Sequence, residues 1–139
     1  MPTMAKVFLD TNILLYGYDG SERKKLDLSR AALKQLEADG NAVISTQVIQ
    51  EFYSIATRKM GMEPLFAKEV IGSFERFETI VVSPQLINSA IDCQILSRLS
   101  FWDALIVVTA ESARCDLLWT EDLHPGQLIR GLRVQNPLG

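Results

Sequence analysis

The sequence has few of the side chains that commonly hold transition metals or act as nucleophile partners. It contains one histidine, His124, and two cysteines, Cys93 and Cys115, in 139 residues. A zinc site built from these side chains is therefore not expected. The cysteines lack metal-ligand spacing and lie in segments of helical pattern, so we expect two reduced core thiols rather than a disulfide. His124 precedes Pro125 and Gly126, and we interpret it as a turn residue rather than a base.

The chain also lacks a long apolar run, a glycine-rich phosphate loop and an excess of positive charge. The longest suitable uncharged stretch, residues 104–110, is far too short to cross a bilayer. Without a phosphate loop, nucleotide binding of the familiar kinds is not indicated. The formal net charge of −3 argues against a general nucleic-acid binder, and we interpret the basic groups at 23–25 and 58–59 as solvated helix faces. RNA is not excluded as a substrate, because a bound divalent cation inverts the local sign of an acidic cleft.

The composition is that of a folded globular protein. Apolar residues make up 47% of the chain and charged residues 22%. At this length the chain is most simply one domain spanning residues 1–139. We expect the aromatic side chains Phe101, Trp102 and Trp119 in its core. Residues 1–6 lead directly into a short apolar run, so we expect no secretory signal and a cytoplasmic location.

Short β-rich runs alternate with longer helical patterns along the whole chain. The runs predict strands at 7–9, 42–45, 79–83, 117–120 and 133–135. The helical patterns cover 26–38, 47–59, 65–77, 85–97 and 101–113. Turn and helix-boundary residues separate them, namely Gly40, Gly61, Pro64 and Pro84. This order predicts an α/β fold, a three-layer sandwich with a mostly parallel five-stranded sheet.

Four carboxylates lie in or beside apolar runs, where an unpaired charge is costly. They are Asp10, Glu51, Asp103 and Asp122, called here the acidic quartet. Asp10 directly follows the first predicted strand and Asp122 closely follows the fourth. In an open parallel sheet the functional crevice lies beyond the carboxyl ends of the strands, so both acids belong to that edge. Glu51 and Asp103 occupy the first two turns of helices that should begin near the same edge. Four such acids in one small domain indicate a shared cation.

For two members of the quartet, Asp10 and Glu51, a purely structural role explains the sequence poorly. Asp10, Thr11 and Asn12 could cap a short helix at 13–16, but only one cap is needed there. We therefore assign Asp10 a ligand role and Thr11 or Asn12 a supporting hydrogen-bond role. Glu51 lies on the core side of the helix 47–59 rather than opposite it, which fits a solvated face badly.

The other two acids have stronger alternatives. Ser100 and Asp103 are spaced as in a capping box, and a first-turn acid also suits the helix dipole. The residues that follow Asp103 at helical spacing are apolar, so the cap and the ligand interpretations are evenly balanced. Asp122 would be an ordinary loop acid if taken alone, and Glu121 would serve equally well. Its assignment depends on the other three.

The residues around these acids resemble a known family. Phe-Leu-Asp-Thr-Asn at 8–12 resembles the opening motif of PIN-domain nucleases. Ser-Phe-Trp-Asp-Ala-Leu-Ile at 100–106 and Thr-Glu-Asp-Leu at 120–123 are similar to the bacterial VapC-like toxin branch, as is Gln-Glu-Phe at 50–52, which lies between the opening motif and residue 100 in the sequence. The similarity covers essentially the whole chain, and the motifs occur in the order of the family. Pro125 departs from the usual loop of that branch.

The resemblance implies a parallel five-stranded sheet in the order 3-2-1-4-5 and a metal-dependent endoribonuclease. It implies a homodimer that acts on RNA and is neutralised by a small cognate antitoxin, whose tail occupies the acidic groove. Oxygen ligands favour Mg²⁺ or Mn²⁺, held mainly by Asp10 and Asp103. Glu51 and Asp122 are candidate metal ligands as well, and Asp122 or Glu51 would orient a water for in-line attack on a phosphodiester. The sequence does not divide the metal-binding and water-positioning roles among the four acids. The implied site is completed by three polar residues: Thr11, Asn12 and Thr120.

Two other functions are compatible with parts of this pattern. A PIN-fold protein could process RNA, or bind it without cutting, and not be a toxin. A receiver domain also binds Mg²⁺ in an acidic pocket and accepts phosphate on an aspartate. That domain needs adjacent acids after the first strand and a lysine after the last, whereas this chain has Asp-Thr-Asn at 10–12 and no evident lysine of that kind. We therefore favour the nuclease.

Overall fold

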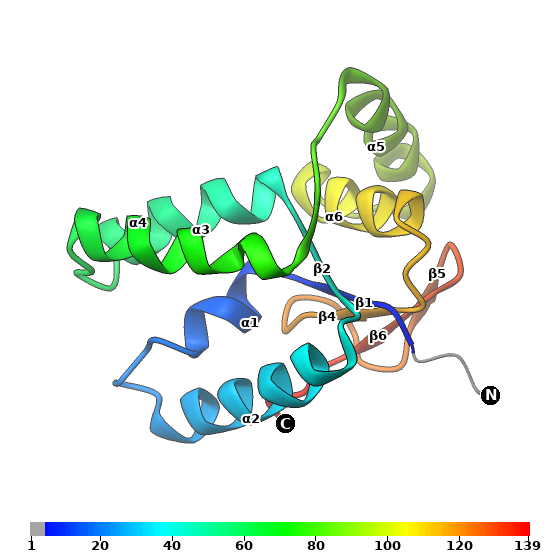
Figure 1. Ribbon diagram of the computed structural model, residues 1–139. Helices are drawn as coiled ribbons and strands as arrows, with labels where there is room; N and C mark the ends of the chain where they lie inside the picture. The colour runs from blue at the N-terminus through cyan, green and yellow to red at the C-terminus, as the bar shows by residue number, and fades with distance from the viewer. Residues whose placement is uncertain (1–4) are drawn as a thin grey trace.

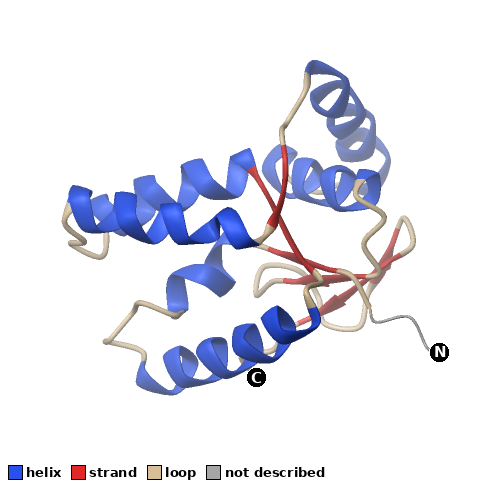
Figure 2. Cartoon of the chain, viewed as in Figure 1, coloured by secondary structure: helices blue, strands red, loops and turns tan. Residues whose placement is uncertain are grey.

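A six-stranded sheet runs through the middle of the molecule, with helices packed around it (Figures 1 and 2). The computed structural model describes residues 5–139; residues 1–4, part of the segment expected to hold no secretory signal, lie outside that range. The strands are β1 (Val7–Leu9), β2 (Ala42–Ser45), β3 (Glu78–Ile80), β4 (Leu117–Trp119), β5 (Leu128–Ile129) and β6 (Leu132–Gln135). Their order across the sheet is β3-β2-β1-β4-β6-β5.

The predicted α/β fold and the predicted strand order are confirmed. Strands β3, β2, β1, β4 and β6 pair in parallel, and β6 is the fifth strand of the sequence-based scheme. The additional strand is β5, which pairs antiparallel with β6. The two residues that connect them, Arg130 and Gly131, both have positive φ angles, as a tight hairpin turn of this length requires. A strand of two residues is too short to produce a recognisable alternation of apolar and polar side chains.

The helices begin close to the predicted positions because capping residues fix them. They are α1 (Thr11–Tyr16), α2 (Arg23–Asp39), α3 (Thr46–Arg58), α4 (Pro64–Ser73), α5 (Pro84–Ser97) and α6 (Phe101–Ser112), with a 3-10 turn at Phe74–Arg76. The hydroxyls of Ser45, Ser83 and Ser100 accept backbone N–H groups in the first turns of α3, α5 and α6. Helix α2 lies on one side of the sheet, and α5 and α6 lie on the other (Figure 1).

The core fixes the two helices that carry acidic residues. Residues 104–110 of α6 are all buried, and the helix packs against α5 and the sheet. On α3, the Phe52 ring is fully buried and meets the rings of Phe74 and Tyr18 edge to face, with centroids 5.1 and 6.0 Å away. The position of Glu51, the residue before Phe52, is set by this packing.

The structure differs from the sequence-based expectation at the end of the third strand and at one of the three aromatic residues expected in the core. The third strand ends at Ile80, not Ser83, because the N–H of Val82 donates to the Thr46 hydroxyl (3.1 Å) instead of to a strand. Trp102 was expected in the core and is 62% exposed, because it lies in the first turn of α6 ahead of the buried stretch. The other two aromatics of that group, Phe101 and Trp119, are partly buried and pack against the core.

Both cysteines are free and buried, as predicted. Burial raises the pKa of the Cys115 thiol to about 12, so it behaves as a small apolar side chain. Among the helices of residues 5–139, none is by itself long and apolar enough to span a membrane.

Candidate acidic active site

The site begins where two neighbouring parallel strands end. Strands β1 and β4 pair in register with Leu9 opposite Trp119, so the next residues along each strand, Asp10 and Thr120, lie side by side. The Thr120 hydroxyl donates to Asp10 Oδ2 (2.7 Å), and the N–H of Thr11 donates to Asp10 Oδ1 (2.7 Å). Asp10 thus caps α1 and is only 7% exposed. Asp10 Oδ1 makes the capping contact, and Oδ2 accepts the hydrogen bond from Thr120.

The Asp10 carboxylate is held in a costly environment. Its pKa is raised from 3.8 to about 6, chiefly by burial and to a smaller extent by the charges of Asp122 and Glu51. The hydrogen bonds from Thr120 and Thr11 act in the opposite direction but do not cancel this rise. The charged form therefore lacks compensation from the protein alone, and a nearby cation would supply it.

Thr120 also positions Asp122. The N–H of Asp122 donates to the Thr120 hydroxyl (3.0 Å), and the amide of Asn12 donates to Asp122 Oδ2 (3.1 Å). The pKa of Asp122 is raised by its partial burial and then by the charges of Asp103 and Glu121. The neighbouring acid has a different partner, since Lys25 Nζ lies 2.7 Å from Glu121 Oε2. This ion pair separates the roles of Glu121 and Asp122, which the sequence alone left equivalent.

Glu51 is half-buried and is oriented from within its own helix. Gln47 lies one turn earlier on α3, and its amide donates to Glu51 Oε1 (2.7 Å) and to the carbonyl of Trp102 (3.3 Å). Burial raises the pKa of Glu51, and the charges of Asp103 and Asp122 add to the rise. Gln47 was missing from the predicted site. The four-residue spacing of a glutamine and a glutamate on one helix was the available signal.

The cap and ligand interpretations of Asp103 are compatible, because they involve different parts of the residue. Its backbone N–H donates to the Ser100 hydroxyl (3.1 Å), so the N-cap of α6 exists as the sequence predicts. Its carboxylate takes no part in that cap and accepts no hydrogen bond from residues 5–139. The cap uses the main chain of Asp103 and leaves the side chain available for a ligand.

Electrostatic coupling joins all four acids into one cluster. The charges of Asp122 and Glu51 raise the pKa of Asp10, and the charge of Asp103 raises the pKa of both Glu51 and Asp122. Three of the four acids line a cleft of about 630 Å³, called here the acidic cleft. Its lining residues are Glu51, Ser54, Arg58, Trp102, Asp103 and Asp122. Asp10 is more deeply buried than these three and couples to the cluster from below the cleft lining.

The donor set fits a hard divalent cation, although it is not preassembled. Within residues 5–139 as they stand, no three carboxylate, histidine or cysteine side chains form a ready metal-binding group. Carboxylates that repel one another are expected to stay apart until a cation neutralises them. Two further oxygens beside Asp10, Thr11 Oγ1 and Asn12 Oδ1, are buried and have no hydrogen-bond partner among these residues. A set made only of oxygens favours Mg²⁺ or Mn²⁺.

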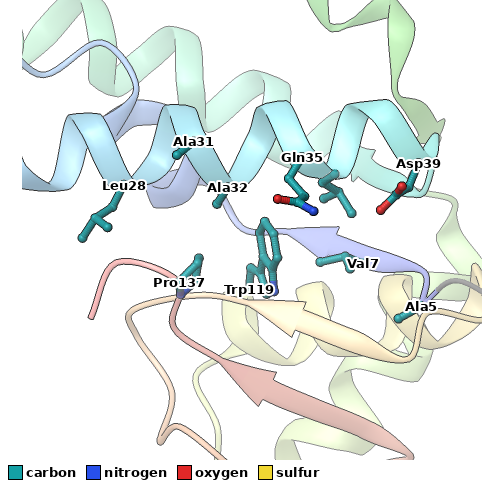
Figure 3. A pocket seen from close by; sticks show the side chains of 10 residues that line it. Ala5, Val7, Leu28, Ala31, Ala32, Gln35, Asp39, Trp119 and Pro137 are labelled. Carbon is teal, nitrogen blue, oxygen red and sulfur yellow. The ribbon is translucent and has the colours of Figure 1, made fainter.

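A second hollow on the molecule has a different character. A groove of about 460 Å³ lies between α2 and the sheet, lined mainly by apolar side chains such as Leu28, Ala32 and Trp119 (Figure 3). It shares no lining residue with the acidic cleft. His124 belongs to neither; it is exposed, and its carbonyl accepts the N–H of Gln127 (3.2 Å) in a turn, as predicted.

Comparison with solved structures gives the same fold. A toxin–antitoxin complex from Klebsiella pneumoniae matches with a TM-score of 0.71 and 22% identity, over 95% of this chain and 98% of that one. VapBC2 from Rickettsia felis, bound to a DNA fragment from its promoter, matches with a TM-score of 0.69 and 20% identity, over 94% and 97% of the two chains. VapC20 from Mycobacterium tuberculosis, a toxin that cleaves the sarcin–ricin loop, matches with a TM-score of 0.63 and 17% identity, over 84% and 92%. The expected likeness to VapC-like proteins is thus confirmed for the fold.

Sequence comparison identifies the family. No curated protein is significantly similar to the sequence. The PIN domain family matches residues 7–127, which include all four members of the acidic quartet and the polar residues beside them. The chain belongs to the PIN domain family.

Proposed function

We propose that this protein is a metal-dependent endoribonuclease and the toxin of a toxin–antitoxin pair. One observation carries the nuclease proposal: four carboxylates from four separate segments gather at a single open cleft, and the charges of other members of the quartet raise the pKa of Asp10, Glu51 and Asp122. Such an arrangement destabilises the metal-free protein at neutral pH, and a bound cation removes the cost. Membership of the PIN domain family and the fold of VapC structures agree with it.

The acids would divide the work between binding and positioning. Asp10 and Asp103 would hold Mg²⁺ or Mn²⁺, because Asp10 is the most buried acid and the Asp103 carboxylate has no competing hydrogen bond. The cation would supply Lewis acidity and neutralise charge that develops on the phosphodiester. Glu51 and Asp122, each fixed by an amide donor, would orient the attacking water. No protein nucleophile is required.

The proposed partners follow from the relatives and from one exposed surface. Two of the matched structures are complexes of a toxin with an antitoxin, which supports a small cognate antitoxin for this chain. Helix α5 carries the exposed apolar side chains Ile91, Ile95 and Leu96. Ile91 and Ile95 lie one helical turn apart and so share one face of α5. Exposed apolar side chains grouped on one face favour an interaction site, which supports the proposed homodimer.

Incubation of the purified protein with RNA tests the activity. We expect internal cleavage in Mg²⁺ or Mn²⁺ and none of comparable rate in chelator. Expression in a bacterial host tests the toxin role: growth should stop, and co-expression of the small reading frame beside the gene should restore it. Cleavage without growth arrest would indicate an RNA-processing nuclease instead, and intact RNA under all metal conditions would refute the nuclease.

Thr120→Val should reduce cleavage without unfolding the protein. The change removes the donor to Asp10 and the acceptor for the N–H of Asp122 while keeping the shape of the side chain. Loss of such outer contacts lowers metal affinity or activity by roughly 10- to 100-fold. The readouts are the cleavage rate and its dependence on Mg²⁺ concentration.

Thr109→Val is the matched control for this change. Thr109 is also a fully buried threonine, but its hydroxyl has no partner among residues 5–139 and lies outside the acidic cleft. We expect full activity and unchanged or slightly higher stability from this variant. Equal losses in the two variants would show that Thr120 acts through the fold and not through the site.

A further inference from the structure

Trp102 is an aromatic ring left in solvent at the edge of the acidic cleft. Its side chain is 62% exposed although the next stretch of α6 is completely buried. The ring packs edge to face on Phe101, with centroids 5.1 Å apart and planes at 78°. The carbonyl of Trp102 accepts the amide of Gln47. The ring is thus held from one side and by its own backbone, and it presents free surface to a ligand.

Trp102 also borders a smaller hollow next to the acidic cleft. This hollow, called here the apolar depression, measures about 210 Å³ and has Val82, Ile87, Phe101 and Leu105 among its lining residues. It shares Trp102 with the acidic cleft, so the two hollows adjoin at the indole ring. A flat apolar group on Trp102 would occupy the depression while a chain attached to it enters the cleft.

The wall of the apolar depression contains two amides, Gln47 and Gln50. Gln47 is buried, and both of its recorded hydrogen bonds use Nε2. Its Oε1 is buried and has no donor among residues 5–139. Donation to Glu51 fixes the orientation of the amide, because the reverse orientation would bring two oxygens together. The Gln47 oxygen is thus an unsatisfied acceptor at the wall of the depression, and the exposed amide of Gln50 on the same wall is open to the N–H groups that nucleobases carry on their edges.

Arg58 is the one cation among the described residues that line the acidic cleft. It lies seven residues after Glu51 on α3, about 10 Å farther along the helix axis and on the same side. Arg58 is exposed and takes part in none of the ion pairs found in residues 5–139. A guanidinium without a carboxylate partner at this distance suits a phosphate adjoining the one at the acids.

We propose that Trp102, where the acidic cleft and the apolar depression adjoin, is the residue on which a base of the RNA substrate stacks. One base stacks on Trp102 with its edge toward Gln47 and Gln50, and a neighbouring phosphate pairs with Arg58. The proposal rests on the proposed ribonuclease function and adds to it the residues that hold a base and a phosphate of the substrate. A base inside a duplex has both faces covered by its neighbours, so only a single-stranded or looped segment can use the Trp102 ring.

Binding of a labelled, unstructured RNA oligonucleotide to the Asp10→Asn protein tests this without cleavage. Trp102→Ala in that background should weaken binding roughly 10-fold or more, and Trp102→Phe should keep most of the affinity because a ring is retained. Tyr53→Ala is the matched control, since Tyr53 is exposed on α3 but lines neither hollow. A duplex of the same sequence should compete poorly.

The salt dependence of binding tests Arg58 separately. Removing one phosphate contact lowers the slope of log affinity against log salt by about 0.7 for a single strand. We expect this change from Arg58→Ala, little change from Arg58→Lys, and none from Lys59→Ala at the next position. A slope that is the same for Arg58→Ala and the parent would remove the phosphate contact from the proposal.

The outcomes separate this proposal from the function beneath it. Normal binding and cutting by Trp102→Ala would overturn the stacking site and leave the ribonuclease intact. RNA binding that depends on Trp102 in a protein that cuts no RNA would refute the ribonuclease and keep the binding site. Unchanged RNA affinity in Trp102→Ala, combined with lost affinity for a basic peptide whose charge complements the three acids of the cleft, would assign the ring to a protein partner instead.

Discussion

Asp10→Asn is expected to abolish RNA cleavage and, in the absence of metal, to stabilise the fold. The loss of activity follows from the central place of Asp10, which is the most buried acid of the quartet and couples to two others. Lewis acidity contributes several kcal/mol to phosphodiester cleavage, so a lost metal ligand should lower the rate about 1,000-fold or more. The asparagine amide oxygen can still accept the N–H of Thr11, and its NH₂ group can donate to the Thr120 hydroxyl, so both contacts are kept and the second one reverses direction.

Most substitutions lower the free energy of unfolding, whereas Asp10→Asn is expected to raise it. The pKa of Asp10 rises from 3.8 to about 6 on folding, so the folded state binds this proton more tightly than the unfolded state. The contribution of Asp10 to stability is therefore greatest below pH 4 and is lost as the pH rises through 6. A shift of about 2 units corresponds to roughly 3 kcal/mol at neutral pH, which the asparagine would recover.

Urea unfolding in chelator at several pH values measures this effect. The difference between the unfolding free energies of Asp10→Asn and the parent should grow from pH 4 to pH 7. Asp27→Asn is the control, because Asp27 is exposed on α2 and forms only a surface pair with Arg23. A variant that is less stable than the parent at pH 7, or one that still cuts RNA at the parental rate, would contradict the assignment of Asp10.

Divalent cations should be required for cleavage and should also stabilise the resting protein. Chelator is expected to lower the rate by about 1,000-fold or more, and Mg²⁺ or Mn²⁺ to restore it. Because the acids raise one another's pKa, a bound cation relieves repulsion that is present before any substrate arrives. Binding at 100 times the dissociation constant would add about 2.7 kcal/mol to the free energy of unfolding.

Thermal unfolding with increasing metal concentration measures this stabilisation. The melting temperature of the parent should rise by several degrees, and that of Asp10→Asn should rise far less. Sodium chloride at matched ionic strength controls for general screening of the acids. If the monovalent salt stabilised the protein as much as Mg²⁺ did, the cluster would be an acidic surface and not a metal site.

Much of the fold was predictable because local and global signals agree. Strands β1 and β2 were predicted with their observed bounds, since each is buried on both faces and reads as a continuous apolar run. The spacing of Ser100 and Asp103 and the prolines at the starts of α4 and α5 placed these three helices within one residue of their observed starts. Val81 was misplaced in β3 because its β-branched side chain favours a strand, whereas the structure leaves it 72% exposed in a connection.

The sequence indicated the candidate site residues that burial marks out. It did not indicate contacts between segments that are far apart along the chain. Asp10 was recognisable because a carboxylate directly after a buried strand has few other roles. The pairing of Lys25 with Glu121 joins residues 96 positions apart, so nothing near either residue in sequence announces it. Trp102 was misjudged because two adjacent aromatics on a helix face different directions, and only the packing of α6 decides which one is covered.

The hydrogen bond between Thr120 and Asp10 has a consequence for synthesis of the chain. It joins residues 110 positions apart, and the strand that brings Thr120 to the site is flanked by β6, near the end of the chain. Contacts of such long sequence separation form late in folding. While the protein is still being translated, the first strand can present Asp10 but not its partners. An unfinished or prematurely terminated product would thus carry the opening motif without an assembled acidic cluster. The cluster would form only after the last strand has joined the sheet.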